Sequence, residues 1–363
     1  MKKVGIITYH FAQNYGAVLQ CYALQTYLSQ HGYDVTVFDF VSEKQSKNND
    51  VVKHGTLIKG VVANLCLLPF NECIRKKHMR YVKFCAEELH MTPRFSTIEE
   101  LKRYIEENRY GIIISGSDQV LNPRIDDFEL AFLYPFPISA KKIAYAASTG
   151  NATREDIQKI QKYLLDFKNI SIREEKDLEK FDIELAAQMS VVCDPVMLLR
   201  ANEWSSMLRK VPEKPYLVCY FLRKKLFGAE FRIAQKISEE LGLEIKVINA
   251  RFSPNSLRKG TIFDAGPKEF VDLIANASYV CTDSFHGTLF SLIFHKQFSC
   301  LDTKQNRHDT RKRGLLESVG AVDAYQNVED ALRICDFLDY KKIDLKIEEA
   351  RTTAAKFLEI LDE

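Results

Sequence analysis

Short apolar runs of strand length alternate with longer helix-like runs along most of this 363-residue chain. Val4–Tyr9 is a largely apolar strand-like run, Gly16–Gln30 has helical spacing of its apolar residues, and Val35–Asp39 is again strand-like. A strand–loop–helix–strand unit of this kind is typical of a parallel sheet with helices packed on it. The alternation therefore predicts the α/β class.

The same alternation continues on both sides of one break. Pro212 and Pro215 interrupt the pattern between Leu199 and Pro215, and we place a domain boundary there. The length also fits two domains. We expect an N-terminal α/β domain over residues 1–200, a C-terminal α/β domain over 215–340, and a final helix over 341–363 that packs on the first domain.

The predicted elements continue the alternation in both halves. Before the break, they are strands Tyr110–Ser115, Lys141–Ala147, Ile170–Ile172 and Val191–Asp194 and the capped helix Thr153–Phe167. After the break, they are strands Tyr216–Leu222, Glu244–Ile248, Tyr279–Thr282 and Phe298–Leu301 and helices Gly228–Leu241, Pro267–Ala275, Thr288–His295 and Tyr340–Leu361.

Composition excludes several classes of function. The net charge of +2 gives no indication of a nucleic-acid partner. Nine cysteines occur without a Cys-x-x-Cys pair, so we expect no zinc site and a reducing, cytoplasmic location. The first apolar run lacks a cleavage site and is interpreted as a strand. The stretch Gly60–Phe70 is too short to span a bilayer but leaves room for peripheral contact with the inner face of a membrane.

The stretch Cys281-Thr-Asp-Ser-Phe-His-Gly-Thr-Leu289 lies where a strand gives way to a helix. The first amides of a helix bind anions, and Gly287 would let a ligand approach the backbone. His286 could exchange a proton near neutral pH. The structural alternative is that Asp283 or Ser284 caps the helix and His286 packs or caps.

Two other loops follow strands in the first half. One carries His10, Asn14, Tyr15 and Gly16 after the first strand, and another carries Asp118 after Tyr110–Ser115. In open parallel sheets, ligands bind beyond the carboxyl ends of strands, so both loops are candidate ligand sites. A Gly-x-Gly-x-x-Gly fingerprint for dinucleotides is absent from the sequence.

Five segments together resemble the polysaccharide pyruvyl transferase family, in order along nearly the whole chain. They are Asn14-Tyr-Gly-Ala-Val-Leu-Gln-Cys-Tyr-Ala-Leu24, Gly116-Ser-Asp-Gln119, Ser171-Ile-Arg-Glu174, Asp194-Pro195 and Thr282-Asp-Ser-Phe-His-Gly-Thr288. The basic run Arg311-Lys-Arg-Gly-Leu-Leu316 is a looser match. The resemblance implies two Rossmann-like domains in a glycosyltransferase-B-like arrangement.

The resemblance also implies transfer of a pyruvyl group from phosphoenolpyruvate onto two sugar hydroxyls, forming a ketal in surface polysaccharide biosynthesis. The family's motif arginine and histidine, linked to donor binding and acid catalysis, match Arg173 and His286. The partners expected are phosphoenolpyruvate and a glycan or lipid-linked glycan acceptor. No metal or further cofactor is expected.

The chemistry of this transfer assigns expected roles to the remaining residues. Arg173 and Arg311 would clamp the donor's carboxylate and phosphate, and His286 would protonate its terminal carbon. Asp118 or Asp283 would be the general base, and the sequence does not choose between them. The other expected donor-binding residues are Ser284, Gly287 and Thr288, on the C-terminal domain, and the expected acceptor-binding residues are His10, Asn14, Tyr15 and Gly16, on the N-terminal domain.

Structural alternatives stand beside these roles. Arg173 could form a surface ion pair with Glu174 or Glu175, and Asp118 could belong to an Asx turn. Asn14 could cap the first helix. Arg307 and Lys312 are expected to be solvated. At the level of function, the alternatives are a glycosyltransferase with a nucleotide-sugar donor and a non-catalytic subunit of a polysaccharide assembly complex.

Overall fold

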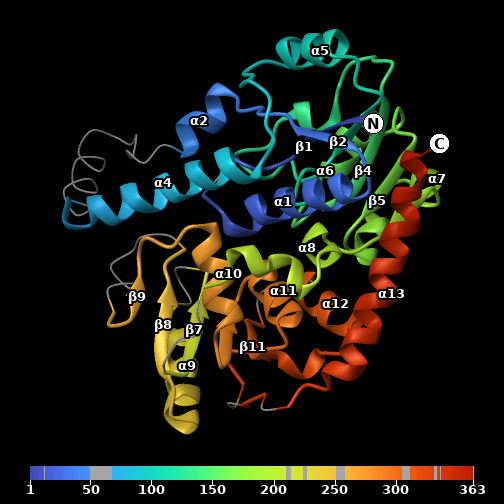
Figure 1. The fold of residues 1–363 in the computed structure, drawn as a ribbon. Helices are drawn as coiled ribbons and strands as arrows, with labels where there is room; N and C mark the ends of the chain where they lie inside the picture. The colour runs from blue at the N-terminus through green and yellow to red at the C-terminus, as the bar shows by residue number, and fades with distance from the viewer. Residues whose placement is uncertain are drawn as a thin grey trace. The chain divides into compact units, whose positions relative to one another are not determined.

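The computed structural model describes residues 1–11, 13–49, 68–209, 214–223, 227–250, 258–304, 311–330, 333–335 and 337–362 (Figure 1). The chain divides into two compact units. Unit 1 comprises Met1–Arg75, Tyr81–Leu198 and Ala350–Glu363, and unit 2 comprises Lys76–Arg80 and Leu199–Glu349. Each unit is built around one parallel sheet.

Unit 1 contains a six-stranded parallel sheet with the strand order β2-β1-β3-β4-β5-β6. The strands are β1 (Lys3–Ile7), β2 (Asp34–Val37), β3 (Ile112–Ser115), β4 (Lys141–Ala147), β5 (Asn169–Ile172) and β6 (Met189–Val191). Because the strand order turns back at β1, the helices that connect the strands cover both faces of the sheet.

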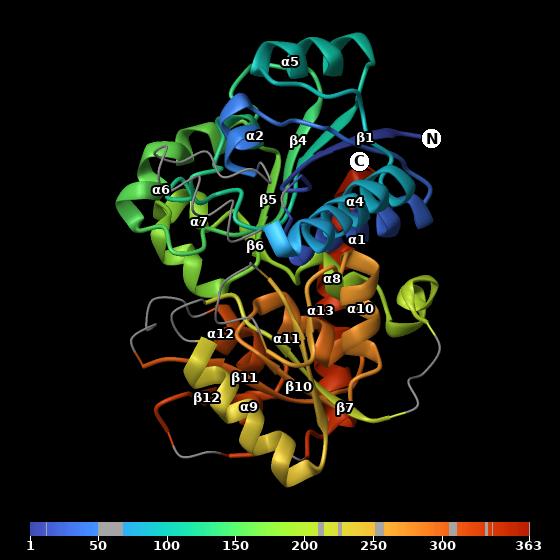
Figure 2. The same cartoon turned by 90° about the vertical axis from the view of Figure 1, so that its left-hand side faces the viewer.

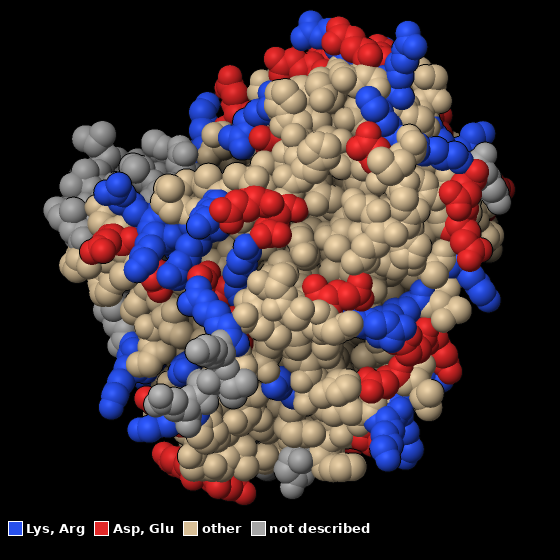
Figure 3. All heavy atoms as spheres, viewed as in Figure 1, with Lys and Arg blue, Asp and Glu red and all other residues tan. Residues whose placement is uncertain are grey.

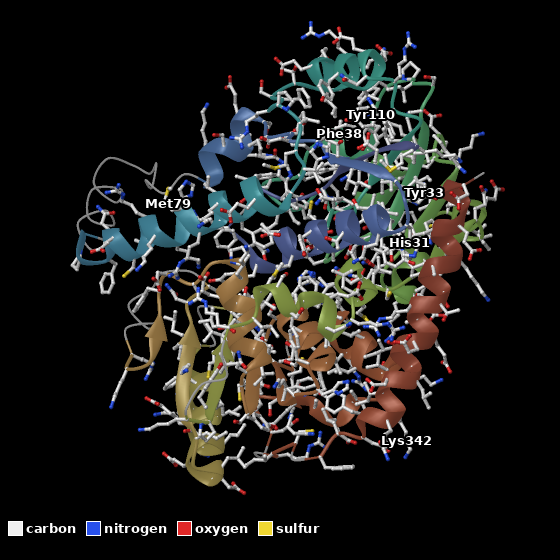
Figure 4. The ribbon with its side chains drawn as sticks, viewed as in Figure 1. His31, Tyr33, Phe38, Met79, Tyr110 and Lys342 are labelled. Atoms are coloured by element: carbon white, nitrogen blue, oxygen red, sulfur yellow. The ribbon has the colours of Figure 1, made fainter. Side chains whose placement is uncertain are left out.

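The two faces of this sheet carry separate cores. One face packs against α1 (Tyr15–Gln30) and against the C-terminal residues Ala354, Leu358 and Leu361. The other packs against α5 (Ile98–Glu107), α6 (Arg154–Ile160) and the 3-10 helix η2 (Leu130–Leu133). Phe38 lies edge-on to Tyr110 in this second core, with ring centroids 5.0 Å apart (Figure 4). The remaining helical segments that begin or lie in unit 1 are α2 (Glu43–Asn49), η1 (Leu68–Phe70), α4 (Asn71–Glu88), η3 (Gln161–Leu164), η4 (Glu175–Lys180), α7 (Ile183–Ala186), α8 (Pro195–Leu198) and η8 (Glu359–Leu361).

Unit 2 also contains a six-stranded parallel sheet, with the order β12-β11-β10-β7-β8-β9. The strands are β7 (Tyr216–Tyr220), β8 (Glu244–Ile248), β9 (Thr261–Ile262), β10 (Tyr279–Thr282), β11 (Gln297–Asp302) and β12 (Tyr325–Asn327). Helix α9 (Phe227–Leu241) covers one face, as Figure 2 shows. On the other face, Phe290 of α11 (Phe285–Ile293) packs its ring against Trp204 and against Phe270 of α10 (Pro267–Ala275). The remaining helices are η5 (Ala201–Met207), α12 (Arg311–Ser318) and η7 (Val322–Ala324).

Helix α13 (Tyr340–Leu358) begins in unit 2, and its residues from Ala350 onward belong to unit 1. In unit 1, Leu358 and Leu361 are buried in the core, and Lys141 Nζ donates a hydrogen bond of 2.7 Å to the carbonyl of Ile360. The expected return of the C-terminal helix to the first domain is therefore confirmed.

The predicted elements agree with the observed ones in kind, but several differ in extent and some observed elements were not predicted. The helix expected over Thr153–Phe167 ends earlier, because α6 stops at Ile160 and a 3-10 turn follows. The strand expected over Val191–Asp194 lies at Met189–Val191. The helix expected from Thr288 begins at Phe285. The short strands β9 and β12 were not predicted.

The surface mixes the two signs of charge. Lys and Arg side chains are interspersed with Asp and Glu over the face shown in Figure 3. None of the helices in the described part of the chain combines the length and apolarity that crossing a bilayer requires.

Candidate functional site

Buried polar side chains gather at the carboxyl ends of the strands in unit 1. Ser115, Ser117 and Asp118 follow or end β3, Ser148 and Thr149 follow β4, and Arg173 and Glu174 follow β5. Burying a polar group is unfavourable unless it is hydrogen-bonded, so a cluster of buried polar side chains is unlike the apolar packing of a core and calls for an explanation. It is the edge at which open parallel sheets bind ligands.

Arg173 lies at the centre of a buried ion network in this region. Its Nε donates to Glu174 Oε1 and its Nη1 donates to Asp194 Oδ2, both at 2.7 Å. Burial lowers the pKa of Arg173, but the carboxylates of Glu174, Asp194 and Asp118 outweigh it and hold the pKa above its usual value. The ion pair with Glu174 that the sequence left open is present, but it is buried and not on the surface.

Asp118 has a backbone conformation that non-glycine residues rarely adopt, with φ of 68°. Its Oδ1 accepts a hydrogen bond of 2.9 Å from the amide of Gln119, so part of its role is that of a turn residue. In the neighbouring strand β4, the pairing with β5 changes register between Ala144 and Ala147, and Ala146 also has a positive φ of 48°. Two adjacent strained positions at a sheet edge are a pattern that is enriched at functional sites.

The loop after β1 is fixed by its own polar side chains. His10 is buried, with Nδ1 at 3.0 Å from the carbonyl oxygen of Thr8 and Nε2 at 2.9 Å from Asp39 Oδ1. Burial raises the pKa of Asp39, but the hydrogen bonds and charges of His10 and Arg94 lower it further than burial raises it. Asn14 caps α1, because its side chain accepts a hydrogen bond from the amide of Gly16.

Tyr15 and Gly16 form the first turn of α1. Tyr15 is buried and its ring lies 5.4 Å from that of Tyr81. The capping role left open for Asn14 is thus present, and acceptor binding by His10, Asn14, Tyr15 and Gly16 stays a prediction.

In unit 2, the turn between β10 and α11 is closed by hydrogen bonds among its own residues. Ser284 is the N-cap of α11, and its hydroxyl accepts from the amide of Gly287 at 3.3 Å. Thr282 Oγ1 donates to the carbonyl of Tyr220 at 2.7 Å and accepts from the amide of Ser284 at 3.1 Å. His286 is therefore in the first turn of the helix, and its ring is largely buried against Phe285.

Gly287 has a packing reason to be glycine. A Cβ at this position would lie 2.4 Å from Thr282 Oγ1, closer than any real contact. The sequence expected the glycine to admit a ligand, whereas the structure shows the space occupied by a threonine hydroxyl. Thr288 is fully buried and donates to the carbonyl of Ser284. Both residues shape the turn, and their expected role in donor binding stays a prediction.

Asp283 is tied to a guanidinium at the carboxyl end of β7. Its two oxygens accept from the amides of Leu222 and Arg223 at 2.6 and 3.0 Å, and Arg223 Nε donates to Oδ2 at 3.0 Å. Both carboxylate oxygens of Asp283 are therefore occupied by fixed donors.

Arg223 joins Asp283 to two more buried acids. Its Nη1 donates to Asp302 Oδ1 at 2.7 Å, and its Nη2 donates to Glu230 Oε1 at 3.1 Å. Lys312 Nζ lies 3.0 Å from Asp302 Oδ2. We call these five residues the Arg223 cluster: Arg223, Glu230, Asp283, Asp302 and Lys312.

Sequence reasoning missed most of this cluster. It named Asp283, but it expected Lys312 to be solvated, and that expectation is wrong because Lys312 is 3% exposed and paired to Asp302. Arg311, the expected donor ligand, begins α12 and is half-buried. Arg307 lies outside the described residues. The sequence signal that could have identified this cluster was position, because Arg223 and Asp302 both lie at the ends of predicted strands.

The structure thus assembles the predicted residues into groups within each unit. Asp118 and Arg173 lie together in unit 1. Asp283, Ser284, His286, Gly287 and Thr288 lie together at the start of α11 in unit 2. Within the described ranges, no group of three or more His, Cys, Asp or Glu side chains is placed to hold a metal ion.

Comparison with protein families finds one match. The model of the family described as polysaccharide pyruvyl transferase matches residues 14–305, which is most of the chain. Comparison with curated proteins finds no significant relative.

Comparison with solved structures finds similar folds at low sequence identity. A UDP-N-acetylglucosamine 2-epimerase from Rickettsia bellii aligns with a TM-score of 0.53 at 11% identity, covering 99% of this chain and 96% of that one. A second UDP-N-acetylglucosamine 2-epimerase aligns with a TM-score of 0.53 at 9% identity, covering 100% and 96%. These likenesses confirm the expected fold class, an α/β fold of glycosyltransferase-B-like type with two Rossmann-like domains.

Proposed function

Because the chain belongs to the polysaccharide pyruvyl transferase family, we propose that it moves the pyruvyl group of phosphoenolpyruvate onto two hydroxyls of a sugar. The product would be a ketal on a glycan or lipid-linked glycan, and the other product inorganic phosphate. The observation that carries the proposal is the turn between β10 and α11. It holds His286 in the first turn of a helix whose N-terminal dipole favours an anion.

The proposed reaction balances with the groups present. His286 gives a proton to the terminal carbon of phosphoenolpyruvate while a sugar hydroxyl adds to the central carbon and gives its proton to the general base, for which Asp118 and Asp283 are the candidates. Phosphate then leaves, and the second hydroxyl adds at the same carbon to close the ketal. The proton of the second hydroxyl leaves with the phosphate or through a carboxylate.

Donor recognition would rest on charge. Phosphoenolpyruvate carries a carboxylate and a phosphate, and Arg311 at the start of α12 can bind either in a bidentate manner. Ser284, Gly287 and Thr288 would contribute by holding the first turn of α11 in place. Arg173, already paired to Glu174 and Asp194, would keep these carboxylates in place at the edge of the sheet in unit 1.

The test combines thermal unfolding with an assay of phosphate release from phosphoenolpyruvate in the presence of sugar acceptors. Saturating phosphoenolpyruvate, at about 100 times its dissociation constant, should add roughly 2.7 kcal/mol to the stability of the wild type. His286→Gln should keep this stabilisation and lose phosphate release by roughly 100-fold or more, as expected for a general acid. Arg311→Ala should lose the stabilisation itself.

A matched control is His295→Gln. This histidine is exposed just beyond the end of α11 and pairs with Asp344, so the variant should behave as wild type. Stabilisation of the wild type by a nucleotide-sugar and not by phosphoenolpyruvate would favour a glycosyltransferase instead. Wild-type turnover in His286→Gln would show that His286 is not the general acid.

A further inference from the structure

Tyr9 is a buried tyrosine whose hydroxyl has no hydrogen-bond partner among the described residues. It follows the end of β1, is 6% exposed, and packs its ring 4.6 Å from that of Phe132. A buried hydroxyl without a partner is unfavourable, and native proteins rarely leave one in that state. Such a group needs an explanation, and a ligand that supplies the missing partner is one.

Other buried tyrosines of unit 1 show that the fold normally satisfies this group. The Tyr134 hydroxyl donates to the carbonyl of Ile114 at 3.1 Å, and the Tyr145 hydroxyl donates to the carbonyl of Cys193 at 3.1 Å. Tyr134 and Tyr9 belong to the same core. The difference between them is location, because Tyr9 stands at the carboxyl edge of the sheet.

A second polar group without a partner lies at the same edge. Ser115, the last residue of β3, is fully buried and its Oγ has no hydrogen-bond partner among the described residues. Ser115 pairs with Ile7 in the sheet, so their side chains project from the same face. Tyr9 lies two residues beyond Ile7 and shares its core, which places both hydroxyls on that face.

The charges of three carboxylates act on the Tyr9 hydroxyl. Burial raises the pKa of Tyr9, and the charges of Asp118, Asp127 and Glu129 raise it further. The phenol therefore stays protonated and can both donate and accept a hydrogen bond. Asp118 is also one of the two candidate general bases of the proposed function.

We propose that the Tyr9 hydroxyl binds a hydroxyl of the sugar acceptor and holds it beside Asp118. This inference rests on the proposed function, because it assigns a subsite of the same transfer. A sugar hydroxyl donates and accepts, so it can satisfy the phenol and present its own proton to the carboxylate. Side-chain shifts at a binding surface are common when a partner arrives, and one would open the buried hydroxyl to the sugar.

The experiment compares Tyr9→Phe with Tyr134→Phe in the full chain. Both substitutions remove one buried hydroxyl from the same core, but only Tyr134 uses its hydroxyl in the free protein. The probes are the methyl glycosides of glucose, galactose and mannose, and the readouts are the melting temperature with and without each glycoside and the KM for the glycoside in phosphate release.

We expect Tyr9→Phe to melt at or above the wild-type temperature and Tyr134→Phe to melt below it. In Tyr9→Phe the dissociation constant of the bound glycoside should rise about tenfold, the effect of one lost hydrogen bond, with the KM for phosphoenolpyruvate unchanged. In Tyr134→Phe glycoside binding should equal that of the wild type.

Three results would overturn the inference. One is a melting temperature lowered equally in both variants, which would mean that Tyr9 has a partner in the free protein. Another is unchanged glycoside affinity in Tyr9→Phe. The third is the absence of any glycoside shift in the wild type. Failure of the proposed function is distinguishable, because it would appear as glycoside binding without phosphate release from phosphoenolpyruvate.

Discussion

Glu230 has a difficult position for a carboxylic acid. It is fully buried on α9, where one oxygen accepts from Arg223 and the other has no partner among the described residues. Burial raises the pKa of Glu230, and the neighbouring carboxylate of Asp283 adds to the rise. Arg223 and Lys312 lower the pKa only in part, so it lies at about 8 instead of 4.5. With Glu230 protonated, the Arg223 cluster has two positive and two negative charges and is neutral.

This predicts a stability that falls as pH rises. Between pH 4.5 and 8, the folded protein keeps the Glu230 proton, whereas the unfolded chain has released it. The contribution of this group to the free energy of unfolding is therefore full below pH 4.5, falls as the pH rises, and is lost once the pH passes about 8. Glu230→Gln cannot ionise and should lack this loss. Urea unfolding of both proteins should therefore show the variant gaining stability relative to wild type as pH rises to 8, then a constant difference.

The matched control for this pH series is Glu349→Gln, because Glu349 is exposed and pairs with Lys346 at the surface. Its difference from wild type should be small and nearly independent of pH across the same range. Parallel curves for wild type and Glu230→Gln would show that Glu230 is ionised in the folded state throughout.

At single positions, the sequence predicted residue types better than their partners. His286, Asp118 and Arg173 could be named because they follow strands and match a family motif, but the pairing of Arg173 to Asp194 joins residues 21 apart. The expectation that Lys312 is solvated failed because a basic run has no apolar periodicity that would show which side of α12 is buried. Tyr9 was counted as the end of an apolar strand, and its missing partner could be recognised only in three dimensions.

At the scale of elements, the start of α11 depends on a close contact between Gly287 and Thr282. Gly287→Ala would place a Cβ 2.4 Å from Thr282 Oγ1, which is held by Tyr220 and Ser284 and cannot easily move. We expect a loss of roughly 1–3 kcal/mol in the free energy of unfolding. Denaturant unfolding measures it, and Thr282→Ala in the same chain should recover part of the loss.

Gly314→Ala provides the comparison, because it lies within α12 and a Cβ there meets no atom within 4 Å. A helical glycine in open space should gain roughly 0.5–1 kcal/mol when replaced by alanine. If both variants changed stability in the same direction and by the same amount, the contact with Thr282 would not be the reason for glycine at 287.

Long elements were predictable, and short or polar ones were not. Strand β10 and helix α10 lie where the apolar pattern and an initial proline put them. Helix α11 begins three residues before the predicted start, because Phe285, His286 and Gly287 form a first turn without helical periodicity. Strands of two or three residues, such as β9 and β12, are too short to show the alternation of apolar and polar residues that predicts a strand. They form because they can pair with a neighbouring strand at the side of the sheet.

At the scale of the whole molecule, α13 connects the two units covalently, since it begins in unit 2 and ends in unit 1. Its last turns complete the core of unit 1, where Leu358 is 5% exposed. The amphipathic pattern of residues 340–361 indicated a packed helix, and the lack of a following strand indicated that it would pack elsewhere than in its own sheet.

Leu358→Ala tests whether this helix end stabilises unit 1 specifically. Truncation of a core leucine should lower the free energy of unfolding by roughly 2–5 kcal/mol. Leu345→Ala, on the same helix but 67% exposed, should change it by about 0.5 kcal/mol or less. Native-state hydrogen exchange locates the effect: amides of β1, β3 and β4 should exchange faster in Leu358→Ala, while those of β7 and β10 keep their protection. Equal acceleration in both sheets would show instead that the two units unfold as one cooperative structure, and that the C-terminal helix stabilises the whole chain.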